Sequence, residues 1–496
     1  MQCKAALGRH RAVSFALWRA KVIKREDTFM KKALALTMAL IMTLGTMAGC
    51  GAASSSTAAS TAAPASTASS AAPAAEGKVL NIYCWNDEYR TRMTALYPDY
   101  DDAKQTIGDV KVNWVSTPNE NNAYQNMLDE ALLKQGSAAD DDKIDLFLIE
   151  ADYARKYTSA DAGVAMSIAD VGLTDADLAD QFQYTKDVVS DENGVQRGTS
   201  WQGCPGVMIY NRTIAKAVLG SDDPAEVQKA VATWDDFNAT AKEMKAQGYY
   251  ISAGWDDSYR VYSNNVSAPW VTDDGTIKID PSIEAWTNDT KALVDAGYVG
   301  KYDLWASEWG AGAKGTAFSY FGPAWFIDFC LAGYTMDKSE ADGGKAEVGN
   351  GTWGDWAVCA GPQGYFWGGT WMCAAEGSDN TALVADIMKT MTCNADTAKE
   401  LTAQFNEFAN NKTAMKAIAE DKTFGSAFLG GQNFVAAMYD SADKIDMKNL
   451  TAYDQGLNET YQKYMHEYFA GTTDKETSLS NFYKEAIEKY PDLKQG

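Results

Sequence analysis

Histidine is scarce in this chain of 496 residues, where His10 and His466 are the only two. Histidine-dependent catalytic triads and most histidine-ligated metal sites are therefore excluded, because His10 also falls in a segment that we expect to be removed. The Gly-x-Ser-x-Gly and His-Glu-x-x-His motifs of hydrolases are missing, and no cysteine pair has Cys-x-x-Cys spacing. The sequence predicts no catalytic residue, no metal site and no cofactor.

Positive charge is also in short supply. The chain has 44 Lys and Arg residues against 67 Asp and Glu residues, a net charge of −23. Removal of residues 1–49 takes away nine basic and two acidic residues and brings the net charge to about −30. An acidic body of this kind repels nucleic acid and anionic lipid surfaces, so we expect neither as a partner.

Long apolar runs are absent except for Ala33–Met47, which is too short for a comfortable membrane span. It follows Met30-Lys31-Lys32 and ends in small residues before Cys50, a pattern typical of a lipoprotein signal peptide at 30–49. Residues 1–29 then form a leader extension, with Met30 as the true start. Lipidated Cys50 would anchor the chain, and the uncharged Ser/Thr/Ala tract to residue 77 would be a flexible linker. A plain secretory signal with a chance cysteine is the alternative.

What the chain does contain is enough apolar and aromatic material for more than one core. Hydrophobic residues make up 46% and aromatic residues 11% of the sequence. A chain of this length is too long to fold around one hydrophobic core, so we expect two or more lobes. Six cysteines remain beyond Cys50. Several stand in apolar runs, where a buried thiol is the commoner case, and the sequence assigns no disulfide among them.

The first part of the chain alternates strands and helices. Strands are expected at 78–85, 109–115 and 143–149, with helices between them, which predicts an α/β lobe. Ligands of such a sheet meet the loops at the carboxyl ends of its strands. Candidate ligand-binding residues in those loops are Trp85, Asp87, Glu150 and Asp152. Helix N-capping is the alternative role for each acid.

Further on, tryptophans recur in turn-rich stretches. Gly198–Arg212 carries Trp201 among glycines and a proline before the apolar run 207–210, as expected of a segment that leaves one lobe and enters another. An ordinary strand after an ordinary loop is the alternative. The segments 365–374 and around 430–432 are the second and third candidate crossings. The other candidate ligand-binding residues are Trp201, Trp255, Asp257, Trp325 and Trp371, and burial in a core is the alternative for each tryptophan.

Together these features resemble the extracellular solute-binding proteins of bacterial ABC importers, in particular family 1, the carbohydrate-binding, maltose-binding-protein-like lipoproteins. The resemblance rests on the segment before Cys50, on DLFLIEADY, PGVMIYNR, WDDF and SYFGPAW, and on GGTWMCAAEGSDN. It covers roughly residues 78–490, without a close match to the second aromatic and acidic loops of maltose-binding protein. It implies a two-lobed, periplasmic-binding-protein-like α/β fold with three hinge crossings.

The resemblance also implies the domain organisation and the partners. Lobe 1 would comprise 78–203 and 371–430, and lobe 2 would comprise 204–370 and 431–496. A sugar would bind between the lobes of a monomer, lipid-anchored on the outer face of the cell membrane, for delivery to ABC permease subunits. The chain would not be an enzyme.

Two other classes of protein remain open. A secreted glycoside hydrolase or another carbohydrate-active surface lipoprotein also needs acids and aromatic side chains in a cleft, although the chain lacks the eightfold repeat of a barrel enzyme. A surface adhesin would need no tryptophans beside acids in loops. The tryptophans beside acids favour a sugar-binding protein, because the C–H faces of a sugar pack on flat rings and its hydroxyl groups bond to carboxylates and amides.

Overall fold

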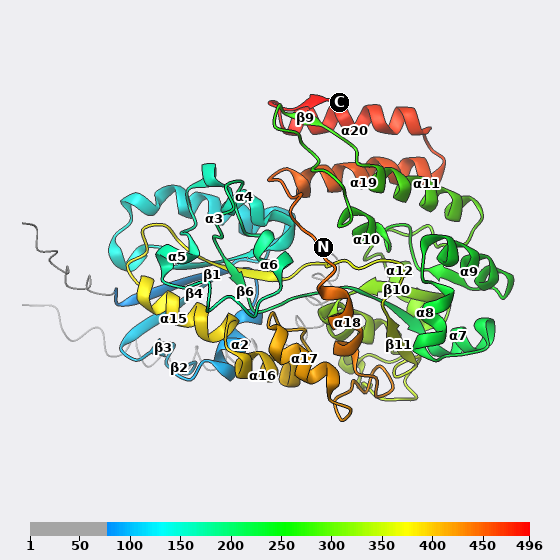
Figure 1. Ribbon diagram of the computed structural model, residues 1–496, viewed down its shortest axis with the longest axis horizontal. Coiled ribbons are helices and arrows are strands. Elements are labelled where there is room, and N and C mark those ends of the chain that lie inside the picture. Colours follow the sequence, from blue (N-terminus) through cyan, green and yellow to red (C-terminus); the bar gives the residue numbers. More distant parts are fainter. Residues whose placement is uncertain (1–76) are drawn as a thin grey trace, which may run out of the picture. The chain divides into compact units, whose positions relative to one another are not determined.

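Two separate sheets organise residues 77–496, the part of the chain that this computed structural model describes (Figure 1). These residues form one compact unit. The predicted leader, the signal peptide, Cys50 and the linker up to residue 76 lie outside the described residues. Within residues 77–496, no helix has the length and apolar character needed to cross a membrane.

The first sheet has seven strands in the order β2-β3-β4-β1-β5-β12-β6. Its centre is parallel, because β1 pairs with both β4 and β5, whereas β12 runs antiparallel to β5 and β6 antiparallel to β12. Leu80, Ile82 and Cys84 of β1 and all the apolar residues of β5 are buried, as expected for strands covered on both faces. The strands are β1 (Val79–Cys84), β2 (Tyr100–Asp101), β3 (Thr106–Ile107), β4 (Val110–Ser116), β5 (Leu146–Glu150), β6 (Thr199–Ser200) and β12 (Thr370–Ala374).

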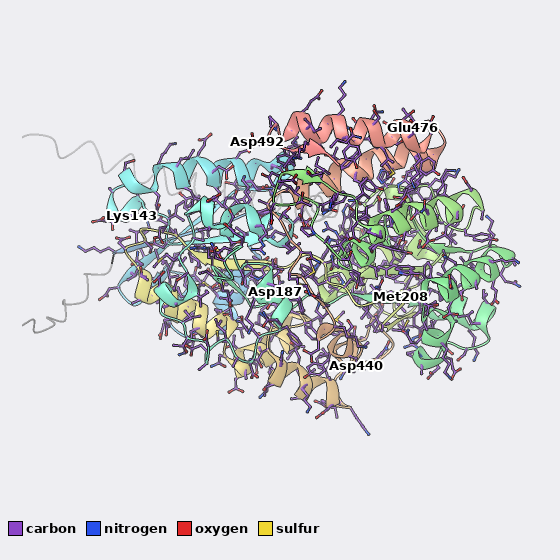
Figure 2. The ribbon with its side chains drawn as sticks, turned by 45° about the horizontal axis from the view of Figure 1, so that its top comes forward. Lys143, Asp187, Met208, Asp440, Glu476 and Asp492 are labelled. Atoms are coloured by element: carbon purple, nitrogen blue, oxygen red, sulfur yellow. The ribbon has the colours of Figure 1, made fainter. Side chains whose placement is uncertain are left out.

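The second sheet has four strands in the order β11-β7-β10-β8. Its central strand β7 is wholly buried, and Met208 on it lies among the side chains of the sheet, whereas Glu476 is exposed (Figure 2). The strands are β7 (Val207–Asn211), β8 (Tyr250–Ser252), β10 (Ala317–Gly322) and β11 (Trp356–Cys359). A small separate sheet pairs β9 (Thr276–Ile277) with β13 (Lys494–Gln495).

The helices begin where the sequence supplies capping side chains. Thr233 accepts a hydrogen bond from the Asp236 amide at the start of α9, and Asp280 caps α11 ahead of Pro281. The helices before β7 are α2 (Glu88–Leu96), α3 (Ala123–Lys134), α4 (Ala154–Thr158), α5 (Ile168–Val171) and α6 (Gln183–Asp187). Those between β7 and β12 are α7 (Arg212–Leu219), α8 (Pro224–Ala230), α9 (Trp234–Ala246), α10 (Tyr259–Ser263), α11 (Pro281–Asp295), α12 (Ser307–Ala311), α13 (Ala324–Phe326) and α14 (Ala332–Thr335). After β12 come α15 (Thr381–Thr392), α16 (Ala395–Phe405), α17 (Lys412–Glu420), α18 (Phe434–Ala442), α19 (Asp454–Ala470) and α20 (Lys475–Lys489).

The chain passes between the two sheets three times, and the three segments are hydrogen-bonded to one another. The first, between β6 and β7, lies in the middle: the Gly206 amide donates to the Tyr365 carbonyl at 2.7 Å on one side. On its other side the Gly203 amide donates to the Phe408 carbonyl at 2.8 Å. The second segment runs from β11 to β12, and the third leads from α16 to α18, which packs on β7 and β11. The predicted lobe boundaries at 203/204, 370/371 and 430/431 remain predictions.

Strand register brings the second crossing to the ligand edge of the first sheet. Thr370 at the start of β12 pairs with Glu150 at the end of β5, and the Ala151 amide donates to the Gly369 carbonyl at 3.3 Å. In the second sheet β8 and β10 are parallel, so the loops that follow them leave from the same edge. Antiparallel pairing of Gly322 with Val207 places that edge where the first crossing enters β7. The loop after β5, the segment after β8 and the second crossing lie at these two edges and surround the site described next, together with the start of α19, which follows helix α18.

Candidate functional site

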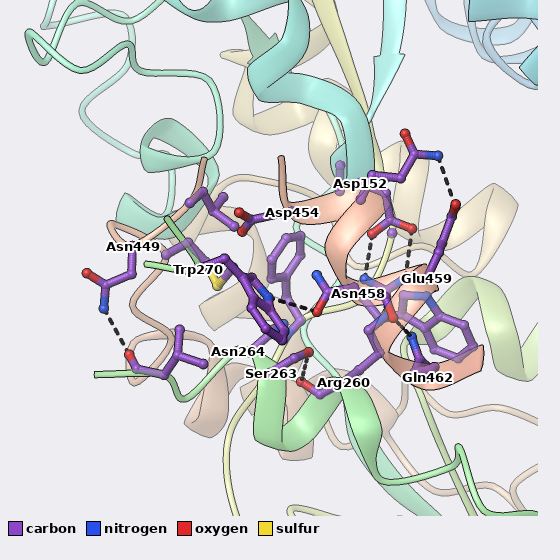
Figure 3. Close-up of a pocket in the computed structure, with 18 of the residues that line it drawn as sticks. Asp152, Arg260, Ser263, Asn264, Trp270, Asn449, Asp454, Asn458, Glu459 and Gln462 are labelled. Atoms are coloured by element: carbon purple, nitrogen blue, oxygen red, sulfur yellow. Dashed lines mark hydrogen bonds and ion pairs between the residues drawn. The ribbon is translucent and has the colours of Figure 1, made fainter. Parts of the chain in front are cut away.

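A cavity of about 100 Å³ lies where the loop after β5, helix α10, the second crossing and the start of α19 meet (Figure 3). Its lining mixes carboxylates, amides and aromatic rings, with one arginine. The lining residues used below are Asp152, Arg260, Asn264, Trp270, Phe366, Trp367, Asn449, Asp454, Asn458 and Gln462.

An ion pair joins the two sides of the cavity. Arg260 on α10 donates through Nη1 and Nη2 to the two carboxylate oxygens of Asp152, at 2.5 and 2.7 Å, as Figure 3 shows. Burial alone would lower the pKa of the Arg260 guanidinium, but the adjacent Asp152 carboxylate raises it above its usual range. Asp152 follows the first sheet and Arg260 follows β8 of the second. The pair therefore links segments from both sheets, in the bidentate geometry that is strongest for charged groups.

Two tryptophans form flat walls of the cavity. Trp367, in the second crossing, has its ring centroid 6.0 Å from the Arg260 guanidinium carbon and 5.5 Å from the Trp305 centroid. Its carbonyl accepts a hydrogen bond from Trp325 Nε1 at 3.0 Å. Trp270 donates through Nε1 to Asn458 Oδ1 at 3.1 Å. Both rings are held by these neighbours, so they present surfaces of fixed orientation.

Amide side chains fill much of the remaining lining. Asn458 Oδ1 also accepts from the Tyr259 hydroxyl, and Asn264 Oδ1 accepts from the Phe366 amide at 2.7 Å. The Gln462 Nε2 donates to the Asn458 carbonyl at 3.1 Å, one turn earlier on α19. Each of these amide side chains has hydrogen-bonding capacity beyond these bonds. The cavity can therefore both donate to and accept from a polar ligand.

Asp454 is a lining carboxylate held by Thr451. Its Oδ1 accepts from the Thr451 amide at 3.0 Å and from the Thr451 hydroxyl at 2.5 Å. Burial raises the pKa of the Asp454 carboxyl to about 7, although the Thr451 bonds and the charge of Arg155 act in the opposite direction. The group is thus close to its midpoint of ionisation at neutral pH.

Of the residues predicted from the sequence, Asp152 lines this cavity. Glu150 lies beside it, half-buried, and its Oε2 accepts from the Asp152 amide at 3.0 Å. Asp87 is exposed at the start of α2 and makes no side-chain capping bond. Trp85 is only 7% exposed and packs edge-on against Tyr124.

Two of the predicted ligand contacts, Trp201 and Trp371, lie in the core and not at the cavity. Trp201 is 1% exposed and stacks on Tyr89 of α2 at a centroid distance of 4.9 Å. Trp371 lies within β12, is fully buried, and donates through Nε1 to the Thr185 carbonyl at 2.8 Å. Both indoles belong to the core beside the first sheet. The turn formers around them shape the chain crossings and do not expose the rings.

Asp257, predicted as a ligand contact, is also a structural residue. Its Oδ2 accepts from the Gly254 amide at 2.7 Å and its Oδ1 accepts from Trp309 Nε1 at 2.8 Å. Trp255 is 8% exposed and stacks on His466 at 5.2 Å. Neither lines the cavity. Trp325 is half-buried behind Trp367, so it supports that wall through its Nε1 bond.

Several lining residues were not predicted from the sequence. Trp367 stands immediately before two glycines, in the same segment as Trp371, and only the strand register shows which of the two faces the cavity. Trp270 stands at the end of a polar stretch, and this position could have identified it as a candidate ligand contact. Arg260 lies on α10, just after a turn that contains two aspartates. Asn458 and Gln462 lie on α19, and nothing local distinguishes them from ordinary surface amides of a helix.

Comparisons with known proteins agree with this architecture. The family model described as bacterial extracellular solute-binding protein matches residues 100–430. No curated protein matches the chain. Many solved structures do, and three of them are described next.

The first is an ABC transporter-associated binding protein from B. animalis subsp. lactis Bl-04, in complex with beta-1,6-galactobiose. It is 17% identical, with a TM-score of 0.60, covering 84% of this chain and 99% of that one. The galacto-N-biose-/lacto-N-biose I-binding protein from Bifidobacterium longum, in complex with lacto-N-biose, is 15% identical with a TM-score of 0.60, covering 85% and 100%. The sugar-binding protein MalE from Xanthomonas citri is 11% identical with a TM-score of 0.60, covering 83% and 96%. These likenesses confirm the predicted two-lobed α/β fold.

Proposed function

Because the chain belongs to the family of bacterial extracellular solute-binding proteins, we propose that it binds a sugar or oligosaccharide between its two lobes and delivers it to an ABC permease. The observation that carries this proposal is the cavity, in which tryptophan walls alternate with amides and carboxylates. The ligands of similar structures, beta-1,6-galactobiose and lacto-N-biose, support a carbohydrate. The chain acts as a binding protein and catalyses no reaction.

The chemistry of the lining suits a sugar. Trp270 and Trp367 border the cavity but are only 5% and 9% exposed, so their faces become available to C–H groups when the lobes open. At about 25 cal/mol per Å², a ring that then covers roughly 50 Å² contributes about 1 kcal/mol. Asn264, Asn458 and Gln462 offer donors and acceptors for hydroxyl groups. Two ring faces with several hydrogen bonds are sufficient for micromolar affinity, about −8 kcal/mol.

Binding and release require the lobes to move apart. The cavity of about 100 Å³ is smaller than the ~300–1,000 Å³ usual for ligand pockets. Three hydrogen-bonded chain segments join the sheets, and a hinge at such segments lets two lobes separate without unfolding. The Asp152–Arg260 pair would form on closure, since its partners come from the two sides.

Cys50, outside the described residues, would carry the lipid that holds the protein at the extracellular face of the membrane. The linker that follows would let a monomer reach the permease. Mass spectrometry of the chain expressed in a bacterium with lipoprotein processing tests the anchor: the expected product begins at a diacylated Cys50.

The sugar-binding proposal is tested by calorimetry of the purified protein with a panel of oligosaccharides, followed by chromatography of each mixture. We expect one or more sugars to bind reversibly and to be recovered unchanged. Gln462→Ala should weaken binding, whereas its control Gln404→Ala, which removes a similar i,i+4 contact on exposed α16, should not. Hydrolysed sugar would identify a glycoside hydrolase, and no binding by any sugar would refute the proposal.

A further inference from the structure

Away from the cavity, three side chains from distant parts of the chain converge. Asp256 lies between β8 and α10, Asp303 lies between α11 and α12, and His466 lies on α19. One ligand atom from each falls within 4.8 Å of the others, the one such group of imidazole, thiolate or carboxylate side chains in residues 77–496. None of the three lines the sugar cavity.

We propose that Asp256, Asp303 and His466 bind a divalent transition metal ion of the Zn²⁺ type. Imidazole nitrogen and carboxylate oxygen are both Zn²⁺ ligands, and three protein ligands leave a fourth position for water. Two carboxylates with a neutral imidazole also balance the charge of the ion. The acidity of the chain, with a net charge of −23, favours cation binding in general.

The distances leave room for the ion after a small change. His466 Nε2 lies 2.7 Å from Asp256 Oδ1, and Nδ1 lies 3.2 Å from Asp303 Oδ1. With bonds of about 2.1 Å, two ligand atoms of a tetrahedral Zn²⁺ ion lie about 3.4 Å apart. A metal ion bound to Nε2 displaces the proton there and lengthens the contact with Asp256. Asp303, whose side chain is 65% exposed, then rotates to supply the third ligand.

The groups around the cluster hold its members in place. Asp256 Oδ2 accepts from the Leu304 amide at 3.3 Å, which leaves Oδ1 directed at His466. Trp255 stacks on the imidazole with 28° between the ring planes and donates through Nε1 to Asp303 at 3.0 Å. Partners of this kind orient metal ligands and sustain their affinity. The His466 side chain is 22% exposed, so solvent reaches the site.

A metal ion here would tie together segments that border the sugar cavity. Asp303 is followed closely by Trp305, whose backbone has a left-handed φ of 73° and whose ring packs on the cavity wall Trp367. His466 lies one turn beyond Gln462 on α19. The sequence predicted no metal site because the chain has one histidine beyond the leader and no Cys-x-x-Cys pair, whereas the fold brings two aspartates to that histidine.

The test is calorimetric titration of the purified chain, without an added histidine tag, with Zn²⁺. We expect saturable binding at a single site, and since loss of a partner that only orients a ligand costs about 10-fold to 100-fold, loss of a ligand in His466→Gln or Asp303→Asn should weaken binding at least that much. Asp337→Asn, which changes another exposed aspartate, is the matched control and should leave binding unchanged. Replacing Zn²⁺ with Co²⁺ should give a visible absorption band that disappears in Asp303→Asn.

Two outcomes would overturn the proposal. One is the absence of saturable Zn²⁺ binding, or equal Zn²⁺ affinity in the wild type and in Asp303→Asn. Because the Asp303 side chain is exposed, this variant should fold even if His466→Gln does not. The other comes from ¹⁵N NMR of the imidazole groups, which is simple because the chain has two histidines. If His466 keeps both ring protons in the presence of Zn²⁺, the cluster is an internal ion pair only.

Discussion

Asp152→Asn is the sharpest probe of how the two sides of the cavity are joined. The substitution keeps the size of the side chain but removes the charge that pairs with Arg260. Arg260 then loses the carboxylate to which both of its Nη atoms donate. We expect the closed arrangement, and with it sugar binding, to be weakened because the pair links a loop of the first sheet to a helix that follows the second.

The magnitude follows from the geometry and exposure of the pair. Net contributions of hydrogen bonds to charged groups are about 1.5–3 kcal/mol, whereas fully exposed pairs give about 0.2–1 kcal/mol. The Arg260 and Asp152 side chains are 27% and 29% exposed, so the pair lies between these cases. We expect about 1–2 kcal/mol, which is roughly a 5-fold to 30-fold increase in Kd.

The assay is a double-mutant cycle with Asp152→Asn, Arg260→Gln and the double variant, with calorimetric Kd values for a sugar found in the screen. The two effects should be non-additive by about 1–2 kcal/mol, since each single variant already breaks the pair. Asp102→Asn, which breaks the Arg90–Asp102 pair beside the first sheet, is the matched control and should leave the Kd unchanged. Additive effects, or unchanged Kd values in both single variants, would refute a pair that holds the lobes together.

Three further predictions concern the core, a lining acid and the crossings. Trp371→Ala should lower the free energy of unfolding by about 3–5 kcal/mol in urea titrations while the folded fraction binds sugar normally, since the indole is buried; altered sugar selectivity would contradict this. The Asp454 carboxyl, with its pKa raised from 3.8 to about 7, binds its proton more tightly in the folded state, so the free energy of unfolding should fall by up to about 4 kcal/mol as pH rises from about 4 to 7. Asp454→Asn should flatten that slope, and an unchanged slope would assign it to other groups. Arg92 pairs with Glu407 next to the third crossing, and both side chains are nearly buried. Arg92→Met should therefore lower the free energy of unfolding by about 3–5 kcal/mol, and the double variant Arg92→Met/Glu407→Leu should lower it clearly less. Equal losses in urea titrations would argue against a coupled pair.

Much of the fold was predictable because local patterns carry it. The expected strands at 78–85, 109–115 and 143–149 are confirmed as β1, β4 and β5, within a few residues. Helix α9 also follows from local chemistry, because Thr233 caps it and its apolar side chains repeat with helical spacing. Each of these features depends on residues that are neighbours in the sequence.

The site was less predictable because its members are not neighbours. Trp367 and Trp371 have similar surroundings in the sequence, yet Trp371 enters β12 and the core whereas Trp367 stays in the crossing and lines the cavity. Asn458 becomes a cavity residue because α19 starts beside the loop after β5. Charge and composition reveal neither event.

By itself the sequence determined the acidic character, the alternation of strands and helices, and the acid after β5, all of which depend on short-range chemistry. Only the tertiary structure decided which tryptophans face the cavity, that Asp152 meets Arg260, and that His466 meets two aspartates. Those contacts arise from strand register and helix packing between segments far apart in the chain, and side-chain patterns along one segment carry no information about them.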